Sequence, residues 1–503
     1  MVFGEAAYSV RRARVTALAL VLTIVAAGCS GSLPDKDNLA TEDRSEAADS
    51  AASLDDPNAA PTEGVDAGAP APGAAGAPAP GTPGRPSQPG AAGSPTSEVA
   101  TTGSGTSSAG GTGSTAQPIR DANLYSGADN TRGITQDQIV MCAHAALIFA
   151  QAFDIRPEDL NVYWTDLNAR GGIFGRKVTM SFEDDVYSPS GAVTAAEKCK
   201  SKNPFLLLGG IGFDQIPAVR AWAEANKMLY FHHMAVEAGM KGKEYSFTGL
   251  PSVDNMGRAF GEHLTAKYKD KKLGIVWRRS ENWEPGYRGG KTYLDGKGAQ
   301  IVADLPVNKD QSVFTQEIIA LRDRGAEVVW LWENALVAAE FIQQAKNQGF
   351  RPQKWVVFPF QTTLDVVGPE PIDGVAAWSA FTQGGFTEFE EHGYGAEIAR
   401  FEAAYAKYRP GVKTNDILWQ TWVGFKAMHD MFERCGPQCT RNRMAGIMLS
   451  GLTATVPPNC PVDYTRPNSF GGHLGGHAFF TMEATDRNKA SFRTTSWCRE
   501  HLN

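Results

Sequence analysis

The clearest absence in this sequence is local. Between Ser30 and Pro118 there is no phenylalanine, tryptophan or tyrosine, and Ala, Gly, Pro, Ser and Thr dominate. Such a segment has too little apolar surface to offset the entropy that it would lose on ordering. We therefore predict a disordered tether over residues 29–118. A coil of roughly 90 residues has a mean reach of about 50 Å.

Motifs of common enzyme chemistry are also missing. The chain contains no Gly-x-Ser-x-Gly elbow, no His-Glu-x-x-His pair and no P-loop, so we predict that it is not an enzyme and that it needs no cofactor. The acidic pair Asp184-Asp185 is the one candidate for acid–base chemistry, but it stands at the end of a predicted strand.

A third absence is that of a strong charge on the globular part. The whole chain has a formal net charge of −7, and the tether carries eleven acidic residues against three basic ones. The remainder from Ile119 onward is therefore nearly neutral. Binding to nucleic acid requires a basic face, so we expect no nucleic-acid partner.

The first 28 residues have the layout of a signal peptide. A basic start precedes an apolar run over 15–27 that is too short to span a bilayer. The run ends in Ala26-Ala27-Gly28-Cys29, which resembles a bacterial lipobox, where the cysteine is lipidated and becomes the new N-terminus. The alternative is an ordinary cleavage site with an incidental cysteine. A two-chain lipid on Cys29 would hold the protein on the outer face of the cell membrane.

Six cysteines follow Cys29, an even number that indicates disulfides in an exported chain. Fifteen pairings are possible. We predict the pairs Cys142–Cys199, Cys435–Cys439 and Cys460–Cys498. No second ligand pair with zinc-like spacing follows Cys435-x3-Cys439, so we expect no metal there.

From Ile119 onward, short apolar runs alternate with longer amphipathic stretches, which predicts an α/β fold with parallel sheets covered by helices. Predicted strands lie at 138–143, 177–183, 204–209, 228–232, 273–277, 300–305, 327–332 and 355–359. Predicted helices lie at 159–169, 192–200, 215–225, 257–268, 315–324 and 336–348. After Phe381 we expect long helices near 395–408 and 415–434 and then an irregular tail.

Specific sequence motifs within this pattern resemble those of a known family. Gly133-Ile134-Thr135 precedes the first strand, and Leu167-Asn168-Ala169-Arg170-Gly171-Gly172-Ile173-Phe174-Gly175-Arg176 joins the first helix to the second strand. With Asp184-Asp185 and Gly209-Gly210, this series resembles the branched-chain amino-acid (Leu/Ile/Val) binding family of type I periplasmic binding proteins.

The resemblance implies two α/β lobes with a cleft between them, in which a solute is trapped by hinge closure. It implies lobe 1 at 119–250 and 383–472, and lobe 2 at 251–382 and 473–503. The crossings would lie near 249–253, 380–385 and 471–479. The implied partners are a small-molecule ligand and the permease and ATPase subunits of an ABC importer. An extracellular ligand sensor and a cell-wall structural lipoprotein are the alternatives.

The first lobe departs from the family at the ligand clamp. Family members offer hydroxyl groups to the ligand carboxylate from the loop after the third strand, but here that loop reads Gly210-Ile211-Gly212-Phe213-Asp214-Gln215. Phe213 and Asp214 are candidate ligand-binding residues, although Asp214 is equally placed to cap the next helix. After the fourth strand, His232 and His233 are candidates for hydrogen bonding to the ligand, or else packing residues.

In the second lobe, Trp283 matches the position of a tyrosine that packs on the ligand in the family. Glu333 and Asn334 follow a predicted strand and reach another cleft position. Phe360 or Gln361 stands where the family has an acidic residue for the ligand amine. The amino-acid clamp is thus replaced by aromatic residues, Trp332 among them, each of which could instead fill the core.

The pair His473-x3-His477 has the spacing of metal ligands on a helix. The glycines around it make a helix unfavourable, so we interpret the segment as a glycine-rich hinge loop and expect no metal.

Overall fold

The computed structural model describes residues 121–500, except 152–153, 233–236, 378–392, 394, 450–452, 455–459, 461, 464–477 and 485–490. The predicted signal peptide, Cys29 and the tether lie outside the described residues. So do His233, His473 and His477, the predicted crossing at 380–385 and most of the one at 471–479.

The first sheet has five parallel strands in the order β2-β1-β3-β4-β5. Its strands are β1 (Gln138–Ala145), β2 (Lys177–Asp184), β3 (Leu206–Gly209), β4 (Tyr230–His232) and β5 (Ser246–Thr248). The helices between them are α2 (Leu147–Gln151), α3 (Pro157–Leu160), α4 (Val162–Ala169), α5 (Pro189–Ser201), α6 (Ile216–Ala225) and α7 (Glu237–Met240). The apolar run of β3 is buried, as expected for a strand that helices cover on both faces.

The second sheet has seven strands in the order β14-β13-β10-β9-β8-β6-β7. Its parallel part consists of β6 (Leu273–Arg279), β7 (Ile301–Asn308), β8 (Val328–Trp332), β9 (Lys354–Val357) and β10 (Ile372–Ala376). The associated helices are α8 (Val253–Tyr268), α9 (Glu284–Gly296), α10 (Thr315–Asp323), α11 (Ala335–Asn347) and α12 (Gln361–Val367). The predicted strands and helices of both sheets are therefore confirmed, with shifts of a few residues at their ends.

The prediction of an irregular tail was wrong. β13 (Ala478–Ala484) pairs antiparallel with β10, and β14 (Phe492–Glu500) pairs antiparallel with β13. This hairpin extends the edge of the second sheet. Phe480, Met482 and Phe492 are buried and alternate with more exposed residues, which is the period-two pattern of a strand.

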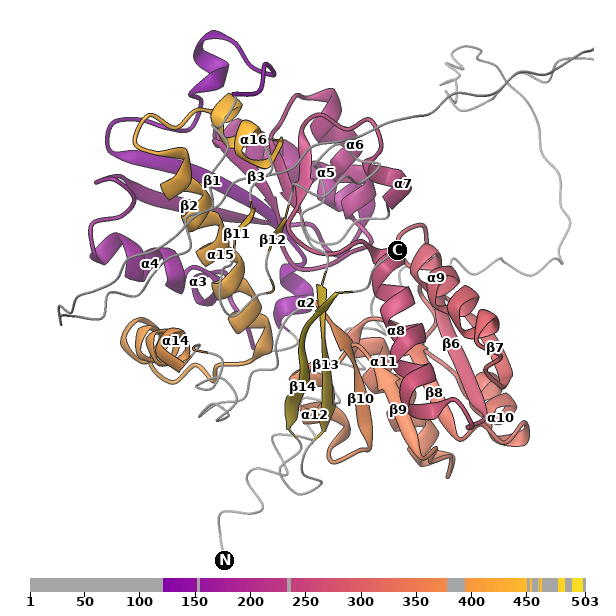
Figure 1. Ribbon diagram of the computed structural model, residues 1–503. Coiled ribbons are helices and arrows are strands. Elements are labelled where there is room, and N and C mark those ends of the chain that lie inside the picture. The colour runs from indigo at the N-terminus through magenta and orange to yellow at the C-terminus, as the bar shows by residue number, and fades with distance from the viewer. Residues whose placement is uncertain are drawn as a thin grey trace, which may run out of the picture. The chain divides into compact units, whose positions relative to one another are not determined.

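Three late helices return to the first sheet, namely α14 (Gly395–Tyr408), α15 (Asp416–Cys435) and α16 (Arg441–Leu449). They share one apolar core with β1 and β3, and Figure 1 shows orange α15 beside indigo β1 and β2. The buried Arg441 guanidinium donates to the carbonyl oxygen of Phe205, at 2.7 Å. We call this assembly, with β1–β5, the N-lobe, and residues 253–376 with β13 and β14 the C-lobe.

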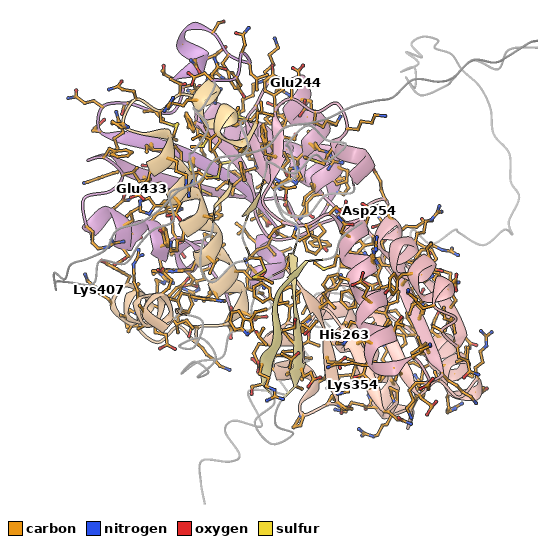
Figure 2. All side chains as sticks on the ribbon, in the orientation of Figure 1. Glu244, Asp254, His263, Lys354, Lys407 and Glu433 are labelled. Carbon is orange, nitrogen blue, oxygen red and sulfur yellow. A yellow bond between two sulfur atoms is a disulfide. The ribbon has the colours of Figure 1, made fainter. Side chains whose placement is uncertain are left out.

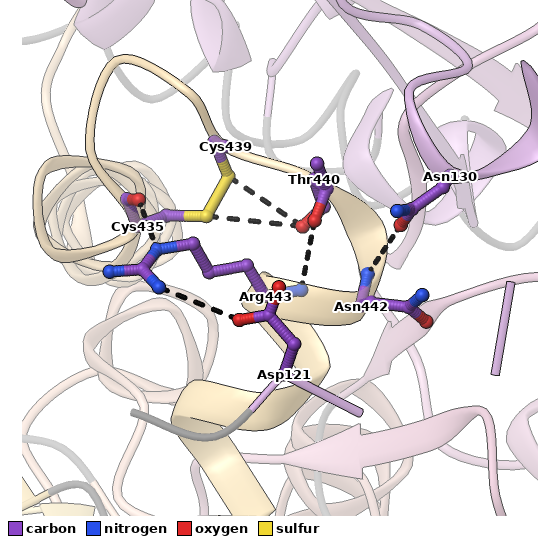
Figure 3. The surroundings of a disulfide bond; sticks show 7 residues. All are labelled: Asp121, Asn130, Cys435, Cys439, Thr440, Asn442 and Arg443. Atoms are coloured by element: carbon purple, nitrogen blue, oxygen red, sulfur yellow. Dashed lines mark hydrogen bonds and ion pairs between the residues drawn. A yellow bond between two sulfur atoms is a disulfide. The ribbon is translucent and has the colours of Figure 1, made fainter. Parts of the chain in front are cut away.

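The start of α16 anchors the segment before β1. Asn442 accepts hydrogen bonds from the backbone N–H groups of Leu124 and Tyr125, both at 2.9 Å, and its own N–H donates to Asn130. Figure 3 shows this region, where the Arg443 guanidinium donates to the carbonyl oxygen of Cys435 at 2.8 Å. The Cys435–Cys439 disulfide closes the turn between α15 and α16.

A buried polar cluster joins α8 to the C-lobe sheet. His263, labelled in Figure 2, lies 3.3 Å from the carboxylate of Asp373 on β10, and the Tyr268 hydroxyl donates to the same carboxylate. Burial by itself raises the pKa of Asp373, but the close contact with His263 and the hydrogen bond from Tyr268 outweigh it and hold the pKa below its ordinary value. The cluster therefore fixes α8 against the sheet with an ionised carboxylate.

All three predicted disulfides are present: Cys142–Cys199, Cys435–Cys439 and Cys460–Cys498. Cys142 and Cys199 are both fully buried, and their disulfide joins β1 to α5. The first bridge closes a separation of 57 residues and the second a separation of 4.

Removing the first bridge should therefore destabilise the protein more than removing the second. Loop-closure entropy predicts a loss of about 4 kcal/mol for a Cys142→Ala/Cys199→Ala double variant, against about 2 kcal/mol for Cys435→Ala/Cys439→Ala. Urea unfolding without reductant measures both. Equal losses would show that chain entropy does not govern the contribution of these bridges.

Candidate functional site

A cavity of about 250 Å³ lies between the two lobes. From the N-lobe it is lined by residues 209–213 after β3, by His232 at the end of β4 and by one side of α15. From the C-lobe it is lined by residues that follow β6, β8 and β9. Both sheets thus present the carboxyl ends of their parallel strands to one cavity, the usual ligand position in open α/β sheets.

Only some of the ligand-binding residues predicted from the sequence lie at the cavity. Phe213, His232, Trp283, Asn334 and Phe360 line the cavity. Asp214, Glu333 and Gln361 are not part of its wall, and the aromatic candidate Trp332 is buried in the C-lobe core, where its indole N–H donates to the carbonyl oxygen of Trp283 at 2.6 Å.

The loop after β3 is positioned by a buried hydrogen-bond network. The Asp185 carboxylate lies 2.9 Å from His144 Nδ1 and accepts from the Gln215 side-chain amide at 3.0 Å. Gly212 adopts a φ of +115°, and a Cβ there would meet the Gln215 side chain at 2.3 Å. Asp185, whose side chain is fully buried, therefore helps to fix the shape of the binding loop.

Asp214 forms an ion pair across the lobes. Its carboxylate lies 2.8 Å from the guanidinium of Arg278 on β6 and accepts from the Ser280 hydroxyl at 3.0 Å. The interpretation of Asp214 as a helix N-cap was wrong, because the residue before α6 is Gln215 and no side chain caps that helix. The charge-assisted hydrogen bond between Asp214 and the buried Arg278 guanidinium is stronger than a hydrogen bond from Asp214 to the helix N-terminus would be.

Glu333 completes this charge cluster from the C-lobe side. It follows β8 and lies 3.6 Å from the Arg278 guanidinium. Burial raises the pKa of Glu333 to about 8, because the attraction of Arg278, shared with Asp214, only partly offsets the loss of solvent.

Further contacts hold the lobes together around the cavity. The Asn282 side-chain amide donates to the carbonyl oxygen of Phe213 at 2.9 Å, and the rings of Phe213 and Trp283 lie 5.6 Å apart, edge to face. The N–H of Gln361, at the start of α12, donates to the carboxylate of Asp416 at 2.8 Å. Burial raises the pKa of Asp416 to about 7. These contacts join the two lobes beside the cavity.

The largest contribution that sequence reasoning missed is the wall formed by α15. Its lining residues recur with the helical period: Ile417, Gln420, Thr421, Gly424, Phe425, Ala427, Met428 and Met431. Trp419 and Trp422 belong to the N-lobe core. The sequence did carry a signal for this second face. The helix has more apolar residues around its circumference than packing against one core requires.

Among the described residues, no group of three or more His, Cys, Asp or Glu side chains is arranged to hold a metal ion. Within the same described ranges, none of the helices combines the length and the hydropathy needed to cross a membrane.

Two α/β lobes that enclose a cavity at the carboxyl ends of their strands define a two-lobed solute-binding architecture. The comparison with known families agrees, since residues 161–487 match the periplasmic binding protein family. The chain belongs to this family, and it has the type I fold.

Relatives and solved structures support this assignment. A Leu/Ile/Val-binding protein homolog 8 from Brucella abortus is 26% identical over 306 residues, which cover 58% of this chain and 69% of the relative. A fatty acid ABC transporter substrate-binding protein from Thermomonospora curvata shares the fold with a TM-score of 0.61 at 18% identity, covering 74% of this chain and 95% of that one. A branched-chain amino acid ABC transporter from Thermus thermophilus, with bound valine, has a TM-score of 0.58 at 14% identity, with coverages of 73% and 98%.

The raised pKa of Glu333 predicts a pH-dependent stability. Below pH 4.5, the ordinary pKa, Glu333 is protonated in both the folded and the unfolded chain, so its protonation costs no stability. As the pH rises from 4.5 through about 8, the unfolded chain releases this proton while the folded chain still holds it, and the free energy of unfolding falls. Wild type should therefore lose stability between pH 5 and pH 9 relative to Glu333→Gln, by a few kcal/mol in total.

Urea midpoints at pH 5, 7 and 9 measure this difference. Glu281→Gln is the control, because Glu281 is exposed and should leave the pH dependence of wild type unchanged. Parallel pH profiles for Glu333→Gln and wild type would contradict a buried carboxyl that holds its proton near neutrality.

Proposed function

We propose that this protein is an extracytoplasmic, lipid-anchored solute-binding protein that captures a small molecule by closure of its lobes and delivers it to an ABC importer. The observation that carries the proposal is the cavity between the lobes, bordered by the Arg278–Asp214 pair. One structural neighbour named as an ABC transporter substrate-binding protein and another named as an ABC transporter support the transport role.

Capture by closure follows from the position of the contacts. The Arg278–Asp214 pair and the Gln361–Asp416 hydrogen bond each join one lobe to the other at the border of the cavity. Separating the lobes would break these contacts and open the cavity to solvent. A ligand that touches both walls would favour the closed state through its differential affinity for the two states.

Closure predicts a change in dimensions on ligand binding. The purified full chain should release a small molecule on denaturation in native mass spectrometry, and the stripped protein should be larger in small-angle scattering than the reloaded one. Arg278→Ala leaves Asp214 and Glu333 without their cation and should shift the loaded protein toward the larger dimensions. Identical scattering with and without the molecule would contradict hinge closure.

Delivery to an importer separates transport from sensing. In the native host, loss of this protein should abolish accumulation of the captured molecule, supplied in labelled form, and re-expression should restore it. Unchanged accumulation together with intact ligand binding would favour the extracellular sensor.

The lipid anchor rests on the sequence Ala27-Gly28-Cys29, at the end of the signal peptide. Two acyl chains hold a protein stably on a membrane, whereas one chain binds reversibly. We place the body on the outer face of the cell membrane, at the end of the tether over 29–118.

Cys29→Ala tests the anchor. The variant should move from the membrane fraction to the soluble extracytoplasmic fraction and lose incorporation of labelled fatty acid, while the thermal unfolding midpoint of the body stays that of wild type. Ser30→Ala, one residue further, is the matched control and should remain on the membrane. Retention of Cys29→Ala on the membrane would favour another means of attachment.

A further inference from the structure

The wall of the cavity is apolar from both lobes. Phe182, Phe231 and Phe425 contribute rings from the N-lobe, and Trp283, Phe358 and Phe360 contribute rings from the C-lobe. Met428 and Met431 add flexible thioether side chains that adapt to the shape of a bound molecule. A ligand in this cavity therefore exchanges water for carbon and sulfur atoms over most of its surface.

Charge is absent from this wall in the part of the chain that the structure describes. None of the described residues that line the cavity is Asp, Glu, Lys or Arg. The acidic candidates nearest to it are engaged elsewhere: Asp214 and Glu333 pair with Arg278. An amino acid carries an ammonium and a carboxylate. The free-energy cost of burying either group without a partner is much larger than the free energy gained by burying an apolar side chain.

Among the described residues, five polar side chains lie on the wall: Tyr187, His232, Asn334, Gln420 and Thr421. The Thr421 hydroxyl donates to the carbonyl oxygen of Ile417 at 2.9 Å. Gln420 of α15 lines the cavity, and its amide nitrogen has no hydrogen-bond partner among the described residues. Asn334 also lines the cavity, but its side-chain oxygen accepts from the N–H groups of Leu336 and Val337 at the start of α11. This inventory suits one hydrogen-bonding end group on an otherwise apolar ligand.

On the basis of the proposed function, we infer that the ligand is a small apolar molecule, an acyl chain with a single polar end, and not an amino acid. Its size is bounded by the cavity of about 250 Å³, which is near the lower end of the ~300–1,000 Å³ common for ligand pockets. A medium-length acyl ester has this chemistry, as does a fatty acid that binds as the neutral acid, since an ionised carboxylate would meet no cation on the wall.

The inference can be tested by a substitution at one residue of the wall that would fill the cavity. Gly424 lies in the middle of α15 and lines the cavity, and a Cβ added there would meet no atom within 4 Å. Because Gly424 is an exposed residue of the cavity wall, we expect a larger side chain at this position to extend toward the space that the ligand would occupy. It also removes a glycine from a helix interior, which favours the fold.

The first experiment is a binding series on the stripped full chain. Calorimetry would use hexanoic, octanoic and decanoic acids with their methyl esters, and leucine and valine as amino-acid probes. Each buried methylene should strengthen binding about fourfold until the cavity is full, so two methylenes add roughly 15-fold. Leucine and valine should bind at least about 100-fold more weakly than the best acyl probe.

The outcomes separate this inference from the proposed function. If leucine or valine binds more tightly than every acyl probe, or if affinity does not depend on chain length, the ligand class is wrong while solute capture stands. If none of the probes binds and no molecule co-purifies, both fail.

The second experiment compares two variants with the same chemical change. Gly424→Phe should weaken binding of the best acyl probe at least about 100-fold, without lowering the thermal unfolding midpoint. The control is Gly296→Phe at the last residue of α9, an exposed glycine outside the cavity whose added Cβ also meets no atom within 4 Å. It should bind as wild type does. Wild-type affinity in a folded Gly424→Phe would show that the ligand binds elsewhere.

Discussion

The ion pair between Arg278 and Asp214 is the contact on which the geometry of the site depends. A buried guanidinium is tolerated only when it is paired and hydrogen-bonded. Arg278, 4% exposed, pairs with the Asp214 carboxylate across the cleft and donates to the carbonyl oxygen of Lys309, and the carboxyl group of Glu333 lies nearby in its own lobe. Because Asp214 belongs to the N-lobe, these requirements are met only when the loop after β3 meets the C-lobe. The electrostatics of this one side chain thus favour one relative placement of the lobes.

The same pairing accounts for the apolar character of the cavity. In a site for a zwitterion, carboxylates and cations at the strand ends must remain available to the ligand. Here Asp214 and Glu333 both lie against Arg278 beside the cavity, and rings such as Phe213 and Phe360 line its inner surface. Phe213 packs against the C-lobe core and Phe360 against both cores, so the walls also carry apolar contacts between the lobes.

The return of the chain to the N-lobe supplies the other half of the site. Helix α15 presents Trp419 and Trp422 to the N-lobe core and a second apolar stripe to the cavity. Its two ends are fixed, by the Asn415 side chain that accepts from the N–H of Leu418 and by the Cys435–Cys439 disulfide. A helix held at both ends should keep the shape of the N-lobe half of the cavity when the lobes separate.

Much of this molecule could be predicted from its amino-acid order. Periodicity located most of the parallel strands, though not β5 or β10, and many of their helices. The Asn-Ala-Arg-Gly-Gly-Ile run indicated the family, and the even cysteine count indicated disulfides. These features are local, or depend on type and spacing. The sequence did not reveal the role of Asp214, because its partner Arg278 is 64 residues away, or the hairpin of β13 and β14. It also did not show that α15 lines the cavity. Only the tertiary structure decided these, because pairing across lobes and the choice of which apolar face stays uncovered depend on contacts between distant segments.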